Sequence, residues 1–175
     1  MLPGKSPFGP YGKMLDCGDG WMVYFNDPLP VPDHPAQAVR MAVGMRDRVA
    51  QLSRGWRKLG YDLDFGVGIA MGFATLGTIG FEGRHDYGAI GSVGNLASRL
   101  SAEAKGGQIL VSQRVHALIE EIAVTEPIGS VELHGFSRPV PAYNVVSLHP
   151  APAPEADTTL ARELPNRGPL RGLGT

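Results

Sequence analysis

Apolar residues recur at helical spacing in the first third of the chain. They are separated by steps of four and three, with basic residues between them. The apolar positions are Ala38, Ala42, Met45, Val49, Leu52, Trp56 and Leu59. This period is typical of an amphipathic helix that buries one face, and Gly60 is the residue type that ends helices. The pattern predicts one long helix that ends near Gly60, follows a turn-rich stretch over 26–35, and carries its arginines on a solvated face.

A strict alternation of bulky and small residues follows the predicted helix. Phe65, Val67, Ile69, Met71 and Phe73 alternate with Gly66, Gly68, Ala70, Gly72 and Ala74. A period of two indicates a β-strand whose successive side chains face opposite sides. Because glycine and alanine leave one side almost bare, another element can approach the backbone there. We therefore expect a strand across this segment, with an element packed closely against its small face.

The remaining segments predict shorter strands and two further helices. Asp-Gly within Gly18-Asp19-Gly20 lies between apolar runs, which favours a hairpin and places Asp19 at a strand end. Ser112 is a favourable N-cap, and Gly106-Gly107 ends the helix before it. Strands are expected near 75–80, 86–90, 108–111, 131–134 and 143–148, and helices from about Val93 and over 113–122. Hairpins interleaved with crossovers predict an α/β (α+β) sandwich with one mixed sheet, which a ferredoxin-like core fits.

Composition divides the chain into three parts. Residues 1–13 are rich in Pro and Gly and are expected to be irregular, whereas residues 14–148 carry the periodic patterns of a folded domain. Residues 149–175 are rich in Pro, Gly and Ala and have no apolar period, which is typical of a disordered tail. The length of 175 residues fits one domain with a single core.

Charge and cysteine content narrow the classes of function. Sixteen basic and seventeen acidic residues give a net charge of −1, so the chain has no global field that attracts nucleic acid or a membrane surface. Any anionic ligand must therefore be recognised by a local site. The single cysteine, Cys17, excludes an internal disulfide and a zinc cluster, which favours a cytoplasmic location. No apolar run reaches the length of a membrane span, and no secretion signal is recognisable.

Asn95 and Arg99 form the most informative pair of polar residues. Four residues apart on a helix, an amide and a guanidinium project from one face, where they can hold a phosphate group. Structural alternatives remain open at this point. An amide is common in the first turn of a helix, an arginine stem often covers apolar surface, and Asp19 is also a residue type that forms turns.

The surroundings of this pair resemble a known family. The pair is embedded in Tyr87-(x)3-Gly91-(x)3-Asn95-Leu96-Ala97-(x)-Arg99-Leu100 and is followed by Ala104-Lys105-Gly106-Gly107-Gln108-Ile109-Leu110-Val111-Ser112. Further matches are Gly68-Ile69-Ala70-Met71-Gly72, Gly77-Thr78-Ile79-Gly80 and Leu133-His134-Gly135. With the hairpin at Asp19, these motifs resemble the catalytic domain of class III adenylate and guanylate cyclases, from about residue 15 to residue 146.

The resemblance implies a reaction and the residues that perform it. Members of this family form a 3′,5′-cyclic nucleotide and pyrophosphate from ATP or GTP with Mg²⁺ or Mn²⁺. Asp19 matches one of the metal-binding carboxylates, Asn95 the residue that orients the ribose, and Arg99 the residue that stabilises the α-phosphate. Gly88 stands at the base-reading position, where it offers no side chain. Arg138 is a candidate to replace the lysine that many members direct at the terminal phosphates.

The chain departs from the family pattern at its front. The Asp that the family carries on its first strand has no counterpart, and residues 1–13 are too short to supply that strand and its two helices. A single carboxylate is a poor anchor for Mg²⁺, and a missing central strand leaves an open sheet edge. Leu15 also replaces a base-reading lysine of adenylate cyclases. We therefore expect an N-terminally truncated cyclase domain with little or no activity alone, and the choice between ATP and GTP stays open.

The resemblance also implies a partner. Cyclase sites form between two protomers in head-to-tail contact, so Asp19 and Arg99 of one chain serve different sites. A homodimer is expected, and pairing with a complete cyclase is chemically possible. Two other classes of function stay open: a catalytically silent cyclase-like module that dimerises or binds nucleotide, and a ferredoxin-like RNA-binding module. The near-zero net charge argues against the RNA-binding module.

Overall fold

The computed structural model describes residues 12–16, 20–81, 84–132 and 135–150. Its elements, in chain order, are β1 (Gly12–Asp16), β2 (Trp21–Phe25), α1 (His34–Lys58), β3 (Val67–Ile69), β4 (Thr75–Phe81), β5 (Arg84–Ile90), α2 (Ser92–Glu103), β6 (Ile109–Ser112), α3 (Gln113–Ile119), β7 (Ala123–Val131) and β8 (Val140–Leu148). None of the helices in these ranges is long and apolar enough to cross a membrane.

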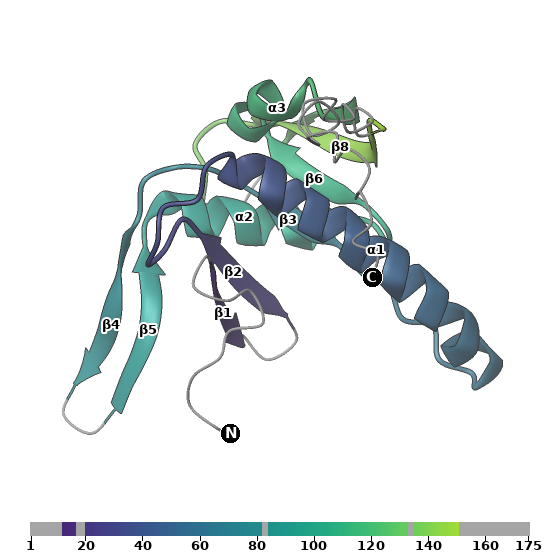
Figure 1. Ribbon diagram of the computed structural model, residues 1–175, viewed down its shortest axis with the longest axis horizontal. Helices are drawn as coiled ribbons and strands as arrows, with labels where there is room; N and C mark the ends of the chain where they lie inside the picture. The colour runs from purple at the N-terminus through teal and green to yellow at the C-terminus, as the bar shows by residue number, and fades with distance from the viewer. Residues whose placement is uncertain (1–11, 17–19, 82–83, 133–134, 151–175) are drawn as a thin grey trace, which may run out of the picture.

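A mixed sheet of four strands forms the body of the molecule (Figure 1), in the order β3-β6-β8-β7. β3 runs parallel to β6, whereas β8 is antiparallel to both of its neighbours. The pairs β1-β2 and β4-β5 are separate antiparallel hairpins. The predicted mixed α/β architecture is therefore confirmed for the described residues.

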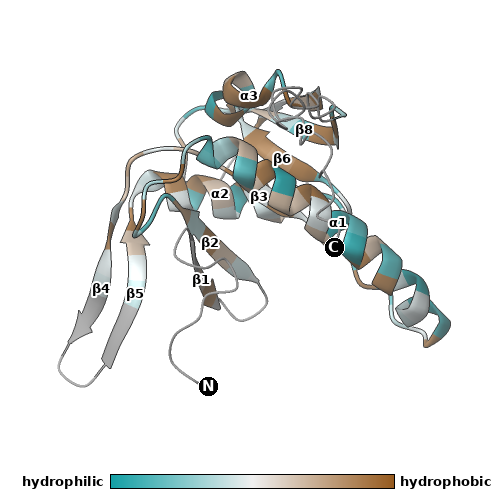
Figure 2. Cartoon of the chain, viewed as in Figure 1, coloured by the Kyte–Doolittle hydropathy of each residue, from teal (hydrophilic) through white to brown (hydrophobic). Residues whose placement is uncertain are grey.

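β6 lies at the centre of the core because both of its faces are covered. Successive strand residues point to opposite faces, and all four residues of β6 are buried. Ile109 and Val111 pack with α1 and α3, whereas Leu110 packs with Leu100 of α2. α1 and α3 therefore cover one face of the sheet and α2 covers the other. In Figure 2, β6 and α3 are mainly hydrophobic, whereas the C-terminal half of α1 carries many hydrophilic positions.

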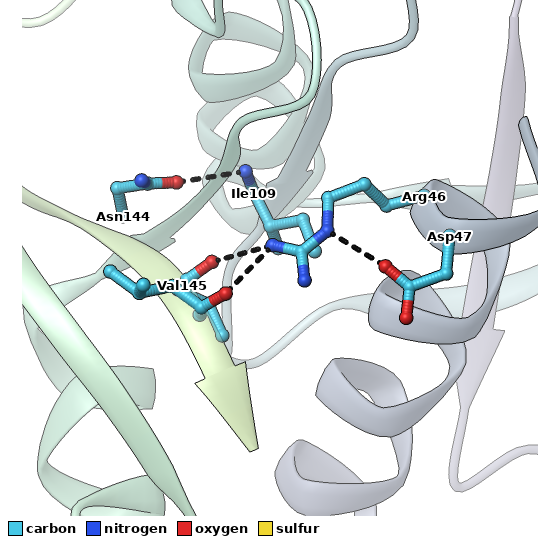
Figure 3. A network of polar contacts seen from close by, with 6 residues as sticks. Arg46, Asp47, Ile109, Asn144 and Val145 are labelled. Atoms are coloured by element: carbon cyan, nitrogen blue, oxygen red, sulfur yellow. Dashed lines mark hydrogen bonds and ion pairs between the residues drawn. The ribbon is translucent and has the colours of Figure 1, made fainter. Parts of the chain in front are cut away.

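Arg46 of α1 corrects the expectation that the arginines of this helix are solvated. Its Nη1 donates to the carbonyl oxygens of Val145 and Val146, at 3.1 Å each, and its Nε donates to Asp47. Figure 3 shows this guanidinium reaching from α1 to β8. The pairing of β8 with β6 ends at Asn144, so Arg46 binds carbonyl groups just beyond that ladder. The helix is thus held to the sheet by polar contacts as well as by its apolar face.

Several predicted boundaries were wrong. The helix begins at His34, inside the expected turn region, because Pro35 fits the first turn of a helix. The strand expected from Phe65 to Ala74 is confined to β3, and Phe73 is 92% exposed. α3 ends at Ile119, and the Ser112 side chain makes no capping hydrogen bond there.

The largest error concerns β7, which was expected near 131–134 and instead spans Ala123–Val131. Pro127 and Gly129 resemble turn residues. They lie at a register shift of an edge strand, and Gly129 has a φ of 97°. Proline and glycine are tolerated at such irregular edge positions. Residues 133 and 134 lie outside the described part of the chain.

The close approach predicted at the small face of β3 is confirmed. A Cβ atom at Gly68 would lie 2.9 Å from the carbonyl carbon of Leu100, and closer still to the Ala97 oxygen and the Ser101 nitrogen. Ser101 Oγ also donates to the carbonyl oxygen of Gly66 at 3.3 Å. α2 therefore lies with its backbone directly on β3, and any side chain at Gly68 would push it away.

We expect Gly68→Ala to destabilise the fold by about 2–3 kcal/mol or to prevent folding, because overpacking here meets backbone atoms that cannot rotate aside. Gly44→Ala is the matched control, since a Cβ at this exposed position of α1 meets nothing within 4 Å. Alanine should instead stabilise the helix by about 0.5–1 kcal/mol. Urea unfolding followed by circular dichroism measures both changes. Equal stabilities of the two variants would contradict the packing described here.

Candidate functional site

α2 carries the central pair of candidate residues, and its start is held by glycine. Gly91 is the N-cap residue and makes no side-chain capping bond. A Cβ atom at Gly91 would lie 2.9 Å from the Phe73 carbonyl oxygen and 3.1 Å from the Ala74 Cα. The backbone at the start of α2 therefore lies against the segment that leads into β4, which fixes where the helix begins.

The two faces of α2 have different chemical character. Leu100 is fully buried, and Leu96 and Ala104 pack against the same cluster. Asn95 and Arg99 are both exposed. The prediction that they lie on one helix is confirmed, and a spacing of four residues places their side chains one turn apart on the same face. In the described part of the chain, neither side chain makes a hydrogen bond or ion pair with another residue.

An exposed amide and guanidinium on one face are suited to binding an anion. The guanidinium offers five N–H donors in a planar fork that matches phosphate oxygens. The amide offers both a donor and an acceptor, which suits a hydroxyl group. Since the net charge of the chain is −1, attraction for an anion at this face depends on the local charge of Arg99.

Gly88 lies on β5 directly opposite Gly77 of β4. Neither residue has a side chain, and a Cβ at Gly77 would meet nothing within 4 Å. The hairpin is therefore bare at this register. This cross-strand pair therefore presents only backbone.

The other two candidate site residues are not part of α2. Arg138 is exposed and lies in the segment between β7 and β8. Phe136 of the same segment packs against the cluster around Leu100, so the segment and α2 rest on a common core. Asp19 lies outside the described residues, and its place relative to Asn95 and Arg99 is a prediction.

The described residues do not by themselves fit a metal site. Across the ranges that the structure describes, no group of three or more His, Cys, Asp or Glu side chains is close enough to hold an ion. Asp19, the carboxylate implicated by the sequence, is not among the residues searched. The geometry at hand therefore concerns the anion-binding face alone.

One polar contact near the site was missed from the sequence. The Tyr87 hydroxyl donates to Asp27 Oδ2 at 2.5 Å and joins β5 to the loop after β2. This hydrogen bond raises the pKa of Tyr87 to about 12, with a further contribution from burial. The sequence around Asp27, Asn26-Asp27-Pro28, is typical of an ordinary turn. No pattern in the sequence relates Asp27 to Tyr87, which lies 60 positions away.

Comparison with known proteins decides the family. Residues 11–147 match the adenylate and guanylate cyclase catalytic domain. The chain belongs to this family. The resemblance inferred from the motifs around Asn95 and Arg99 is therefore confirmed.

Solved and curated cyclases agree with this assignment. The adenylyl cyclase CyaB from P. aeruginosa is 36% identical, with a TM-score of 0.73 over 78% of this chain and 72% of that chain. The guanylyl cyclase Cya2 is 28% identical, with a TM-score of 0.69 over 80% and 72%. Adenylate cyclase 1 of Rhizobium meliloti (strain 1021) is 29% identical over 134 residues, which are 75% of this chain and 20% of that protein. The cyclase domain thus spans about a fifth of this curated relative.

We expect Tyr87 of this cyclase domain to titrate near pH 12. A tyrosine in the unfolded chain titrates near 10. Because the folded pKa is the higher one, the stabilisation from this hydrogen bond is complete below pH 10 and is lost as the pH rises through 12. A pH titration followed by the absorbance of tyrosinate measures this pKa.

Asp27→Ala should return the pKa of Tyr87 to the ordinary range of tyrosines. Tyr87→Phe should remove the late step, which is the step near pH 12, from the titration curve. Tyr61→Phe is the control, since this side chain is 61% exposed. A late step that persists in Tyr87→Phe would show that the hydrogen bond is assigned to the wrong tyrosine.

Proposed function

We propose that this cyclase domain contributes the ribose- and phosphate-binding half of a nucleotidyl cyclase site, which forms a 3′,5′-cyclic nucleotide and pyrophosphate from ATP or GTP. The observation that supports this most directly is the exposed pair Asn95 and Arg99 on one face of α2, in a chain that belongs to the cyclase family. Both adenylyl and guanylyl cyclases are among its relatives.

The reaction needs an in-line attack of the ribose 3′-oxygen on the α-phosphorus while pyrophosphate leaves. Positioning and electrostatic stabilisation supply most of the catalysis in phosphoryl transfer. In our proposal Asn95 holds the ribose so that the 3′-oxygen faces the phosphorus. Arg99 donates to the α-phosphate oxygens, whose negative charge it stabilises in the transition state.

Three further assignments complete the proposed substrate site. Arg138 contacts the terminal phosphates, and the bare pair Gly77 and Gly88 leaves the base unread by a side chain at that register. Asp19 supplies one metal-binding carboxylate. Mg²⁺ or Mn²⁺, when bound, would lower the pKa of the 3′-hydroxyl and neutralise the triphosphate charge.

We also propose that the 175-residue chain has little activity by itself. The sequence contains no Asp or Glu before Asp16, so the first-strand carboxylate of the family is not supplied by these residues. Two carboxylates normally hold the metal ions of such a site. These 175 residues then depend on a further carboxylate, supplied by another polypeptide segment, for metal binding.

The proposed partner is a second cyclase domain, either an identical chain or a complete cyclase. Asn95 and Arg99 face away from their own core, so a facing surface is needed to enclose a nucleotide. Large apolar side chains are exposed on or next to the two hairpins, namely Trp21 (65%), Phe73 (92%) and Ile90 (62%). Apolar exposure of this kind marks surfaces that associate. We place this pairing in the cytoplasm and expect neither nucleic acid nor a membrane as partner.

A catalytically silent module is the second candidate function. The absence of side chains at the paired glycines Gly77 and Gly88 favours it. Such a module would bind a nucleoside triphosphate and dimerise, without forming cyclic nucleotide in any pairing. The experiment below separates the two functions.

Complementation tests the proposed half-site. The purified chain alone should form cyclic nucleotide from ATP or GTP with Mn²⁺ only near background. Mixed with a cyclase domain that keeps its metal carboxylates but lacks its own catalytic arginine, it should restore activity. Arg99→Ala in this chain should lower that activity by about a hundredfold or more, the size typical of losing one transition-state donor.

Arg54→Ala is the matched control, because Arg54 is an exposed arginine of α1, and it should leave the restored activity unchanged. Restored activity that survives Arg99→Ala would contradict the half-site. Nucleotide binding without turnover in any pairing would identify the silent module. Robust turnover by the chain alone would overturn its dependence on a partner.

Sedimentation analysis tests the pairing itself. We expect a concentration-dependent monomer–dimer equilibrium, with association weakened at least tenfold by Phe73→Ser because a largely exposed aromatic is removed from the associating surface. Leu118→Ser is the control, since Leu118 is 55% exposed but lies on α3. A monomer at all concentrations would contradict self-association and leave pairing with another cyclase to the mixing experiment.

A further inference from the structure

The hydrogen bond between Tyr87 and Asp27 joins β5 to the loop that follows β2. Tyr87 lies on β5, four residues before Gly91, the residue that starts α2. Asp27 lies on the loop between β2 and α1, and its Oδ2 is 2.5 Å from the hydroxyl oxygen of Tyr87. In Figure 1 this loop passes beside the end of β5 that leads into α2.

Among the described residues, the β4-β5 hairpin projects from the sheet and its helices. Its two strands pack chiefly against each other, and Figure 1 shows it projecting from the body of the molecule. Backbone contacts at its base come from Gly91, which lies against Phe73 and Ala74, and Val93 packs on Gly72. These contacts hold the base of the hairpin against the start of α2. The Tyr87–Asp27 hydrogen bond, called the tie below, lies a few residues away along β5. It can therefore determine the direction in which the hairpin leaves the body of the molecule.

The acceptor side of the tie is itself held in place. Asn26 adopts a φ of 68°, and its Oδ1 accepts a hydrogen bond from the Val31 N–H at 2.8 Å. Val31 is buried, and its carbonyl oxygen lies 3.2 Å from Nδ1 of His34, the first residue of α1. The loop that presents Asp27 is thus anchored to the start of the helix that packs on the central sheet.

We propose that Tyr87 and Asp27 are positioning residues, which together set the orientation of the β4-β5 hairpin and of the first turn of α2 relative to the core. The inference rests on the proposed function for its consequence in binding, because the first turn of α2 carries Asn95. Neither residue acts on substrate. Their hydrogen bond acts through Gly91, which transmits the position of β5 to the start of α2.

The test separates the tie from the binding function by two measurements. Hydrogen exchange of backbone amides reports the order of the hairpin and of α2. Calorimetric titration with GTP or with ATP, each with Mn²⁺, reports nucleotide affinity; it uses the chain mixed with the complementing cyclase domain, well below the unfolding temperature. The variants are Tyr87→Phe, Asp27→Ala, Asp27→Asn and the double variant Tyr87→Phe/Asp27→Ala.

Tyr87→Phe and Asp27→Ala should each speed amide exchange in residues 87–95 and weaken nucleotide affinity about tenfold, the size typical of losing a hydrogen bond to a charged group. Asp27→Asn should stay close to the wild type, because its amide oxygen still accepts from the Tyr87 hydroxyl. The double variant should be no worse than the single variants. Tyr61→Phe and Asp62→Ala are matched exposed controls and should change neither measurement.

Each other result has a definite meaning. Unchanged exchange in Tyr87→Phe and Asp27→Ala overturns the proposal, whatever the affinity. Equal effects in the control variants also overturn it, since the loss would then be general. Absence of binding of both GTP and ATP by the wild type mixed with the complementing cyclase domain refutes the proposed function, and faster exchange confined to residues 87–95 would still support the tie.

Discussion

The contact between the backbone of α2 and Gly68 is the constraint on which the candidate site depends. At Gly68 the helix lies on β3 with no side chain between them. β3 is in turn parallel to β6, the strand whose four residues are all buried. The helix is therefore placed by main-chain atoms on the best-packed part of the molecule. Asn95 and Arg99 inherit that placement, because a rigid helix fixes the direction of each Cα–Cβ bond.

A different kind of constraint acts on the hairpins. The sheet and its helices are joined by continuous apolar clusters on both faces, whereas β4 and β5 pack mainly with each other. Beyond these apolar clusters, hydrogen bonds between polar groups connect the elements. Arg46 binds the carbonyl groups beyond the β6-β8 ladder, and Tyr87 binds Asp27 beside the end of β5. Such ties are directional, so they specify an orientation that a few apolar contacts would leave variable.

Local sequence patterns predicted those parts of the fold whose determinants are local. The period of apolar residues in α1, the small face at Gly68 and the placement of Asn95 and Arg99 on one helix all depend on neighbours within a turn or two. β7 was misplaced because Pro127 and Gly129 resemble turn residues when the partner strand is unknown. The contacts of Arg46 with β8 and of Tyr87 with Asp27 span 99 and 60 positions. Neither has a periodic signal, because tertiary folding alone brings those groups together.

The exposure of Arg99 has a consequence for how a site of the proposed kind works. A free guanidinium on the surface is well hydrated, and its attraction for a phosphate is weakened by the high dielectric of water. Enclosing that face with a second domain removes water and strengthens the same attraction, without any change in the residues themselves. Association would then create the electrostatic part of catalysis as well as complete the set of side chains. On the proposed function, the folded chain supplies a rigid, correctly oriented donor pair, and assembly supplies the environment in which that pair stabilises charge.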